Sequence, residues 1–466
     1  MTAPPRFAIV GHPNKGKSSI VATLAEDDSV QISPDPGTTT RARVFPMRLD
    51  GTTLYELIDT PGFQRAREAL AWLAAHERGA ESRPAVLAEF VAAHRTDPRF
   101  AHECELLAPI VAGAGILYVV DGSRPYGREY EPEMEVLRWS GRPRMALINL
   151  IGNGDHVAAW RTALDQYFAI VRVFDAVEAD FDRRIALLRA FGELSDEWRA
   201  ALGRAADALV AERARRAGRA AHEIASLLGD ALTATVRERL PDENAEALRI
   251  ERLSVELKEA IRRRERDARS AVQDLYRHGR ARREETALGL LDADAFSAQS
   301  FSVFGLSSGQ LALTAAASGA AALGGIDVLL GGASLGLAAA VGALVGGAGA
   351  LLGARELAKV RVLGRRAGGY ELIVGPLSAP NVPWVLLGRA LLHHRLVAER
   401  NHARREAIVI ELERGASFAD RIDAPRRRSL ERCFEQLRSA RETDAETTSA
   451  LAREIEQLFA TEDAAS

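Results

Sequence analysis

Eight residues near the N-terminus, Gly11-His-Pro-Asn-Lys-Gly-Lys-Ser18, constrain the fold of this chain more than any other segment. They match the spacing GxxxxGK[ST], follow an apolar strand-like run, Phe7–Val10, and precede a helix-like run, Ser19–Leu24. A glycine-rich turn in this context points backbone N–H groups at a bound phosphate, and the helix N-terminus adds partial positive charge. The motif therefore predicts an α/β fold with a phosphate-binding loop (P-loop).

The residue types within this loop define the expected contacts with a nucleotide polyphosphate. Lys17 is expected to reach the β- and γ-phosphates, and the hydroxyl of Ser18 is expected to bind Mg²⁺. The chain contains only four lysines, and two of them, Lys15 and Lys17, stand in this loop. Further residues complete the predicted cradle around the phosphates: Gly11, Asn14, Lys15, Gly16 and Ser19.

Two further motifs follow in the order that such a nucleotide site requires. Pro36-Gly-Thr-Thr-Thr40 is a polar loop in which one threonine is expected to bind Mg²⁺ and the γ-phosphate; Thr39 is favoured, and Thr40 is the alternative. Asp59-Thr-Pro-Gly62 ends a strand-like run. Asp59 is expected to hold Mg²⁺ through water, and the Gly62 N–H is expected to contact the γ-phosphate.

The segments GHPNKGKSS, PGTTT and DTPGF together resemble the Era-like branch of the TrmE–Era–EngA class of GTPases. The likeness covers residues 5–176, with GILYVVDGS and VRVFDA as later strands of the G domain. The whole chain also resembles a bacterial family in which such a domain precedes a C-terminal region of unknown function with a Gly/Ala-rich stretch. The resemblance implies binding of GTP and GDP and slow Mg²⁺-dependent hydrolysis of GTP. A homodimer formed through the G domain is a further expectation.

The motif that reads the nucleotide base departs from the family pattern NKxD. Asn149 follows the strand-like run Met145–Ile148 and is placed to bond the base or to brace the P-loop. Three residues later stands Gly152 where an aspartate is expected, and Asp155 lies six residues beyond Asn149. Either the loop lets Asp155 reach the base, or base discrimination is weak. The resemblance favours GTP over ATP, and it assigns the Ala176 backbone N–H to the guanine O6.

The residue after Gly62 is Phe63, where Ras-like switches carry the glutamine that orients the attacking water. Gln64 is the neighbouring alternative. The resemblance also allows Asn14 to ligate a K⁺ ion in place of an arginine finger; otherwise Asn14 stabilises the loop, and a partner supplies an arginine. The predicted catalytic set is therefore Lys17, Thr39, Gly62 and Asn14, with turnover that accelerates on self-association or partner binding.

Alternating strand-like and helical runs over residues 1–195 predict a doubly wound, mostly parallel sheet with helices on both faces. Residues 63–110 read as an inserted helical pair. The predicted strands are Phe7–Val10, Val44–Leu49, Leu54–Ile58, Gly115–Val120, Met145–Ile148 and Ile170–Phe174.

The remainder of the chain is predicted to be mainly helical. Residues 196–290 are rich in Ala, Arg, Glu and Leu at helical spacing, which indicates long charged amphipathic helices. Residues 291–358 are expected to form a Gly/Ala-rich apolar hairpin. Residues 359–466 are expected to form a small β-hairpin, Val360–Leu363 with Tyr370–Val374, followed by helices.

The Gly/Ala-rich stretch is the second feature that bears on function. Within residues 295–354 the only charged residue is Asp327, and each uncharged run exceeds the ~20 residues that cross a bilayer as a helix. Glycines recur four apart, and arginines flank both ends, as in a membrane hairpin with cytoplasmic ends. Two interpretations follow: association with the inner membrane, or a soluble hairpin packed within the protein.

Composition narrows the classes of function. The net charge of −3 and the lack of an RNA-binding motif argue against nucleic acid as a partner and leave ribosome assembly as the least favoured function. Two distant cysteines argue against a disulfide framework and a zinc site. The favoured prediction is a slow GTPase switch whose C-terminal region contacts a membrane or partner, in the cytoplasm or at the inner membrane's cytoplasmic face. The alternative is a membrane-associated structural protein with vestigial hydrolysis.

Overall fold

The computed structural model divides the chain into two compact units that meet in the sequence at Arg213 and Ala214, and each is described separately. The described residues are 3–27, 30, 39–152, 154–243, 246–277, 294–297, 300, 303–305, 358–364, 370–400, 418–439 and 444–463.

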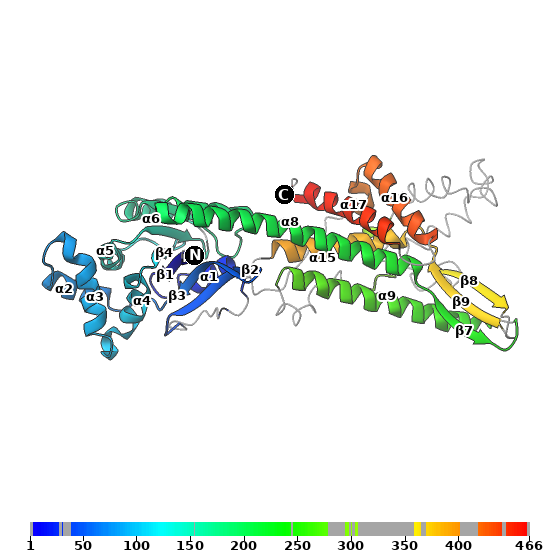
Figure 1. Cartoon of the computed structure of the whole chain (residues 1–466), viewed down its shortest axis with the longest axis horizontal. Coiled ribbons are helices and arrows are strands. Elements are labelled where there is room, and N and C mark those ends of the chain that lie inside the picture. Colours follow the sequence, from blue (N-terminus) through cyan, green and yellow to red (C-terminus); the bar gives the residue numbers. More distant parts are fainter. Residues whose placement is uncertain are drawn as a thin grey trace. The chain divides into compact units, whose positions relative to one another are not determined.

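The first unit is built on a six-stranded sheet in the order β2-β3-β1-β4-β5-β6, which confirms the predicted α/β class (Figure 1). β2 pairs antiparallel with β3, and the other neighbours are parallel. The strands are β1 (Arg6–Val10), β2 (Arg43–Leu49), β3 (Thr52–Asp59), β4 (Gly115–Asp121), β5 (Arg144–Asn149) and β6 (Ile170–Val173).

Alternate residues of the parallel strands face opposite sides of the sheet, because successive side chains of a strand point in opposite directions. Phe7 and Ile9 join the core that α1, α7 and the start of α8 cover. Ala8 and Val10 join the core beneath α2 to α6. The helices are α1 (Lys17–Ala25), α2 (Ala66–Ala75), α3 (Arg83–Ala93), α4 (Ala101–Val111), α5 (Glu131–Trp139), α6 (Val157–Leu164), α7 (Phe181–Gly192) and α8 (Asp196–Thr233).

The segment 63–110, predicted as a helical pair, contains three α-helices, α2, α3 and α4. The additional helix is α4, which carries Leu106, Leu107 and Ile110 into the core and precedes β4 by a short turn. Its apolar positions recur at the spacing of one helical face, so the burial of that face accounts for the helix.

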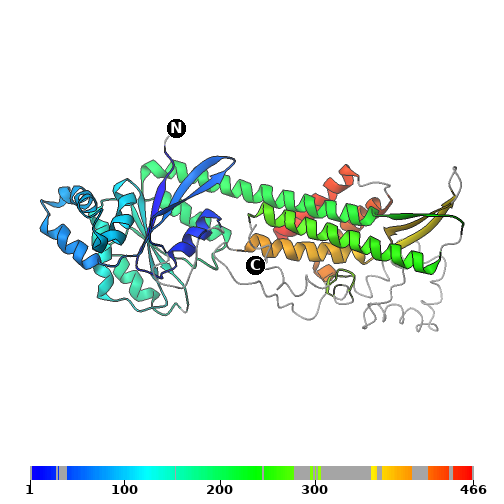
Figure 2. The same cartoon turned by 90° about the horizontal axis from the view of Figure 1, so that it is seen from below.

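The second unit is mainly helical, as predicted, and its helices share one apolar core. Both views show the later part of α8 side by side with α9 and α15 (Figure 2). Its elements are β7 (Val236–Leu240), α9 (Ala247–Leu275), β8 (Ala358–Gly364), β9 (Tyr370–Leu377), α15 (Val382–Glu399), α16 (Ala424–Ser439) and α17 (Ala445–Asp463).

β8 and β9 pair antiparallel at the position of the predicted hairpin. β7 corrects the prediction that helix continues through Val236, because residues 236–240 pair antiparallel with β9. The alternation Val-Arg-Glu-Arg-Leu has the two-residue period of a strand, and Leu240 joins the core while Arg237 and Arg239 are exposed. The partner strand lies more than 130 residues away in the sequence, so helical spacing alone misassigned this segment.

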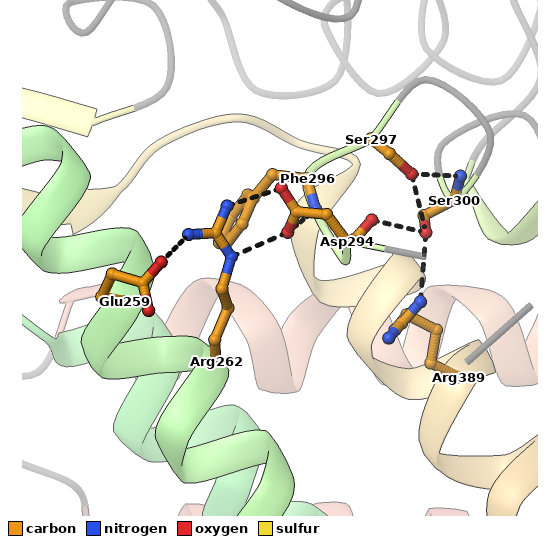
Figure 3. A network of polar contacts seen from close by, with 7 residues as sticks. All are labelled: Glu259, Arg262, Asp294, Phe296, Ser297, Ser300 and Arg389. Carbon is orange, nitrogen blue, oxygen red and sulfur yellow. Dashed lines mark hydrogen bonds and ion pairs between the residues drawn. The ribbon is translucent and has the colours of Figure 1, made fainter. Parts of the chain in front are cut away.

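Polar contacts attach Asp294 and Ser300, near the beginning of the predicted apolar hairpin, to α9 and α15 (Figure 3). Arg262, which also pairs with Glu259, donates two hydrogen bonds to Asp294, at 2.9 and 2.5 Å. Arg389 is buried on α15; it donates to Ser300 at 3.1 Å and pairs with Glu265 at 2.7 Å. These contacts hold Asp294 and Ser300 against the helices of the second unit.

Most of the predicted apolar hairpin, 291–358, lies outside the described residues. Among the helices that the structure describes, none combines the length and apolar character that a membrane crossing requires.

Candidate nucleotide-binding site

The loop from Gly11 to Gly16 joins β1 to α1 in a conformation that depends on glycine. Gly11 and Gly16 have positive φ angles of 140° and 78°, which side chains disfavour. A Cβ atom at Gly11 would lie 2.4 Å from the Val119 carbonyl oxygen, and one at Gly16 would lie 2.2 Å from Asn149 Nδ2. Asn14 is also left-handed, with φ of 59°, a conformation that asparagine tolerates. The glycines of the motif are thus required by the packing as well as by the turn.

Lys17 begins α1 and lies beneath the loop. Its Nζ donates hydrogen bonds to the carbonyl oxygens of Gly11 at 3.3 Å and His12 at 2.9 Å. Burial lowers the pKa of Lys17 to about 8, against the opposing attraction of the Asp59 carboxylate. The ammonium group is therefore held at the loop at a desolvation cost, which an anionic phosphate would offset.

Three oxygen-bearing side chains predicted to hold Mg²⁺ converge at the end of β3. Ser18 Oγ donates to Asp59 Oδ2 at 2.9 Å, and Thr39 Oγ1 donates to the same oxygen at 3.2 Å. Asp59 is 4% exposed, and its Oδ1 is buried without a hydrogen-bond partner in the described part of the chain. Burial raises the pKa of Asp59, opposed by the Ser18 hydrogen bond and by Lys17. One buried carboxylate with two hydroxyls is a donor set that suits Mg²⁺.

The segment after Asp59 passes directly over the P-loop. A Cβ atom at Gly62 would lie 2.5 Å from Pro13 N, so the close approach needs glycine. The Phe63 N–H donates to the Gly11 carbonyl oxygen at 3.3 Å. The Phe63 side chain is 1% exposed, within the core beneath α2 to α6, whereas Gln64 is exposed. Phe63 therefore acts in packing and has no group that could orient water.

Asn149 braces two loops of the site, which is one of the two roles that the sequence left open. Its Nδ2 donates to the Lys15 carbonyl oxygen at 3.1 Å, and its Oδ1 accepts from the Ala176 N–H at 3.0 Å. Thr23 of α1 donates to the Ala176 carbonyl oxygen at 2.7 Å. The Ala176 N–H, which the resemblance assigns to a guanine oxygen, is bonded to Asn149 in this structure.

The remaining predicted site residues lie around this centre. Asp155 is exposed on the loop after β5, and Thr40 is exposed beside Thr39. Ser19 is half-buried in the first turn of α1. Asn14 is exposed at the tip of the P-loop, and its side chain makes no hydrogen bond within the described residues.

Lys15, predicted as part of the cradle, belongs to a set of buried charges at the P-loop whose other members the sequence did not single out. Lys15 Nζ lies 3.9 Å from Asp121 Oδ2 at the end of β4, and burial lowers the pKa of Lys15. Buried Glu133 of α5 accepts from the Tyr118 hydroxyl at 2.9 Å and lies 2.9 Å from His12 Nδ1. The sequence feature that could have identified this set is the second lysine of the loop together with the aspartate that ends the apolar run GILYVVD.

At the carboxyl ends of β1 and β3, this site brings together the glycine-rich loop, the Lys17 ammonium group and three side-chain oxygens with the chemistry of Mg²⁺ ligands. The fold and the site define the N-terminal unit as the G domain of a P-loop GTPase. Residues 6–149 match the family model described as 50S ribosome-binding GTPase. Residues 161–461 match the domain of unknown function DUF3482, and the chain therefore belongs to the family of proteins that carry this domain.

Curated relatives resemble a short part of the chain. GTPase Der of Mycoplasma pneumoniae is 43% identical over 60 residues, which are 13% of this chain and 13% of that protein. GTPase Der of Azoarcus sp. is 48% identical over 63 residues, 14% of each chain. Among solved structures, Aquifex aeolicus Era bound to GDP and AlF4⁻ is 19% identical with a TM-score of 0.29, covering 41% of this chain and 57% of that chain.

Proposed function

We propose that this protein binds GTP with Mg²⁺, hydrolyses it slowly to GDP and phosphate, and acts as a molecular switch that signals to its C-terminal region. The convergence of Ser18 and Thr39 on Asp59, beside the Lys17 ammonium, carries this proposal. Lys17 would stabilise charge on the β- and γ-phosphates, and Ser18, Thr39 and Asp59 would hold Mg²⁺. A bound Mg²⁺ would neutralise charge on the transferring phosphoryl group.

The nucleotide is proposed to be GTP rather than ATP because the similar proteins are named as GTPases. Since Gly152 stands where NKxD has its aspartate, Asp155 or backbone groups would supply the discrimination. The membership in an Era-like class rests on the motifs GHPNKGKSS, PGTTT and DTPGF.

Slow turnover is proposed from the positions of Phe63 and Gln64. Phe63 is buried in the core, and Gln64 is exposed, so neither side chain is set to orient water at the P-loop. Asn14, exposed at the loop tip, could ligate K⁺, and a second copy of the G domain would shield that ion from solvent. Hydrolysis would then accelerate on self-association.

Competition binding and phosphate release with GTP, GDP and ATP, each in K⁺ and in Na⁺, test this function. The parent is expected to bind GTP and GDP more tightly than ATP and to hydrolyse GTP faster in K⁺. Lys17→Ala should abolish binding. Equal binding by Lys17→Ala and the parent would contradict the mechanism, and binding without turnover under any condition would favour a structural protein with vestigial hydrolysis.

The second part of the proposal is association with the cytoplasmic face of the bacterial inner membrane. Residues 295–354 supply the apolar sequence, and the outer face of β7, β9 and β8 supplies cations. Arg237 and Arg361 both stand opposite Ile373 in the register, and Leu363 is 49% exposed on the same face. Glu371 also lies on this face, 4.0 Å from Arg237, and the face is basic because Arg237, Arg239 and Arg361 outnumber it. Basic side chains around an exposed leucine suit an anionic lipid surface.

Pelleting with vesicles of neutral and of anionic lipid tests this association. The parent is expected to pellet with anionic vesicles, and the double variant Arg237→Glu, Arg361→Glu is expected to stay in solution. Resistance of the membrane-bound protein to carbonate would support insertion of the apolar stretch. If the parent stays in solution with both lipids, the proposed membrane association is wrong. Ribosome assembly remains the less favoured alternative function.

A further inference from the structure

Glu103 of α4 holds the backbone after Gly62, the residue whose N–H is expected to contact the γ-phosphate. Its side chain is fully buried, and its Oε1 accepts hydrogen bonds from the N–H groups of Gln64 at 2.8 Å and Arg65 at 2.6 Å. These two residues follow Gly62 and Phe63 and lead directly into α2. A carboxylate at the start of a helix also interacts favourably with the helix dipole.

Glu105, two residues further along α4, holds the segment after Thr39, the residue expected to bind Mg²⁺ and the γ-phosphate. Its Oε2 accepts a hydrogen bond of 3.0 Å from the Ala42 N–H. Ala42 lies three residues after Thr39 and directly before β2. Side chains two apart on a helix point in nearly opposite directions, so α4 stands between the segments that follow Thr39 and Gly62.

The burial of Glu103 opposes any movement of Gln64 and Arg65 away from α4. Its Oε2 is buried and has no hydrogen-bond partner in the described part of the chain. If the two N–H groups left, the carboxylate would remain buried without donors, which costs more than the loss of an exposed hydrogen bond. The contact therefore favours one position of the Gly62 segment over others.

We propose that Glu103 is a positioning residue for hydrolysis. We also propose that Glu103 and Glu105 couple the segment after Gly62 to the segment after Thr39 through α4. Glu103 fixes the start of α2, and thereby the position of the Gly62 N–H above the P-loop. Glu105 transmits a displacement of α4 to the segment after Thr39. The position of α4 within the helical insert thus depends on whether GTP or GDP is bound. This inference rests on the proposed GTPase function.

Glu103→Ala and Glu103→Gln test the positioning role, with Glu89→Ala as the matched control, because Glu89 is an exposed carboxylate of the same insert that pairs with Arg78. In Glu103→Ala, kcat is expected to fall about tenfold or more while the Kd for GTP stays within about threefold. Glu103→Gln keeps an acceptor oxygen and should recover most of kcat. Hydrogen exchange at Gln64 and Arg65 should accelerate in Glu103→Ala alone.

Glu105→Ala tests the coupling and needs no buried charge to be removed. The Ala42 N–H should exchange faster in this variant, and kcat should fall about threefold or more at unchanged Kd. The inference is overturned if kcat in Glu103→Ala or Glu105→Ala equals that of the parent, or if kcat and affinity fall together. Should the parent itself fail to bind or hydrolyse GTP, the proposed function fails instead. If Glu103→Ala does not fold, the kcat of Glu105→Ala and hydrogen exchange at its Ala42 N–H decide.

Discussion

The Ala176 backbone N–H donates a 3.0 Å hydrogen bond to the side-chain oxygen of Asn149. Through its Nδ2, the same carboxamide donates to the Lys15 carbonyl oxygen at 3.1 Å. One buried side chain therefore connects the P-loop, the end of β5 and the loop after β6. The shape of the phosphate cradle depends on a residue more than 130 positions away.

Replacing Asn149 with alanine is expected to disturb the cradle and the fold together. The Lys15 carbonyl and the Ala176 N–H would lose their partner, at a cost of about 1–3 kcal/mol in the free energy of unfolding. Nucleotide affinity should fall about tenfold, which calorimetry would measure. Gln166→Ala, which removes an exposed amide, should change neither. Parent-like affinity in Asn149→Ala would show that the brace is dispensable.

Nucleotide affinity is expected to decline above pH 8. Burial lowers the pKa of Lys17 to about 8, so the neutral amine accumulates in the free protein as the pH rises through this value. A bound polyphosphate favours the charged form and raises the pKa again, so binding near pH 8 should take up protons. At pH 9 affinity should be about tenfold below its value at pH 7. Calorimetry in two buffers of different ionisation enthalpy measures both the affinity and the proton uptake. In Lys17→Arg the side chain is always charged, so the affinity should vary less with pH. Constant affinity from pH 7 to 9 would contradict this prediction.

Asp59→Asn is expected to separate stability from metal binding. Burial raises the pKa of Asp59, which means that the fold disfavours its charge, so the free variant should unfold at the same temperature as the parent or higher. In the parent, chelation of Mg²⁺ should weaken GTP binding about tenfold or more. In Asp59→Asn, chelation should have little effect. A similar effect of chelation on both proteins would place the metal elsewhere.

Removal of Arg389 is expected to destabilise the second unit. Arg389 is 2% exposed and pairs with buried Glu265, which also pairs with Arg269. Truncation to alanine removes one of these two cationic partners of the carboxylate, at a cost of about 1–3 kcal/mol. Arg252→Ala, which breaks an exposed pair with Glu238, should cost about 1 kcal/mol or less. Chemical unfolding followed by the fluorescence of buried Trp384 compares the two variants. Equal losses would show that the buried pair has no special role.

The sequence alone predicted the features that local chemistry specifies. The glycine spacing from Gly11 to Ser18, between an apolar run and a helical run, indicated the P-loop, and the alternation of strands and helices indicated the α/β class. Asp59 could be predicted to hold Mg²⁺ because it ends a strand-like run and begins the motif Asp59-Thr-Pro-Gly62. Each of these inferences uses residues that are close together in the chain.

Tertiary structure decided the relationships between distant residues. The sequence left two roles open for Asn149, and only the structure shows that its side chain bonds to the Lys15 carbonyl and the Ala176 N–H. The sequence also left open whether Asp155 reaches the base, and the structure shows Asp155 exposed on the loop after β5. β7 is a strand because β9 offers it a partner, and Glu103 is significant because α4 packs against Gln64 and Arg65. The sequence by itself thus determined the fold class, most strands of the first unit and the loop predicted to bind phosphate. Packing determined which backbone groups hold that site in place, because hydrogen bonds across the fold depend on how the elements meet.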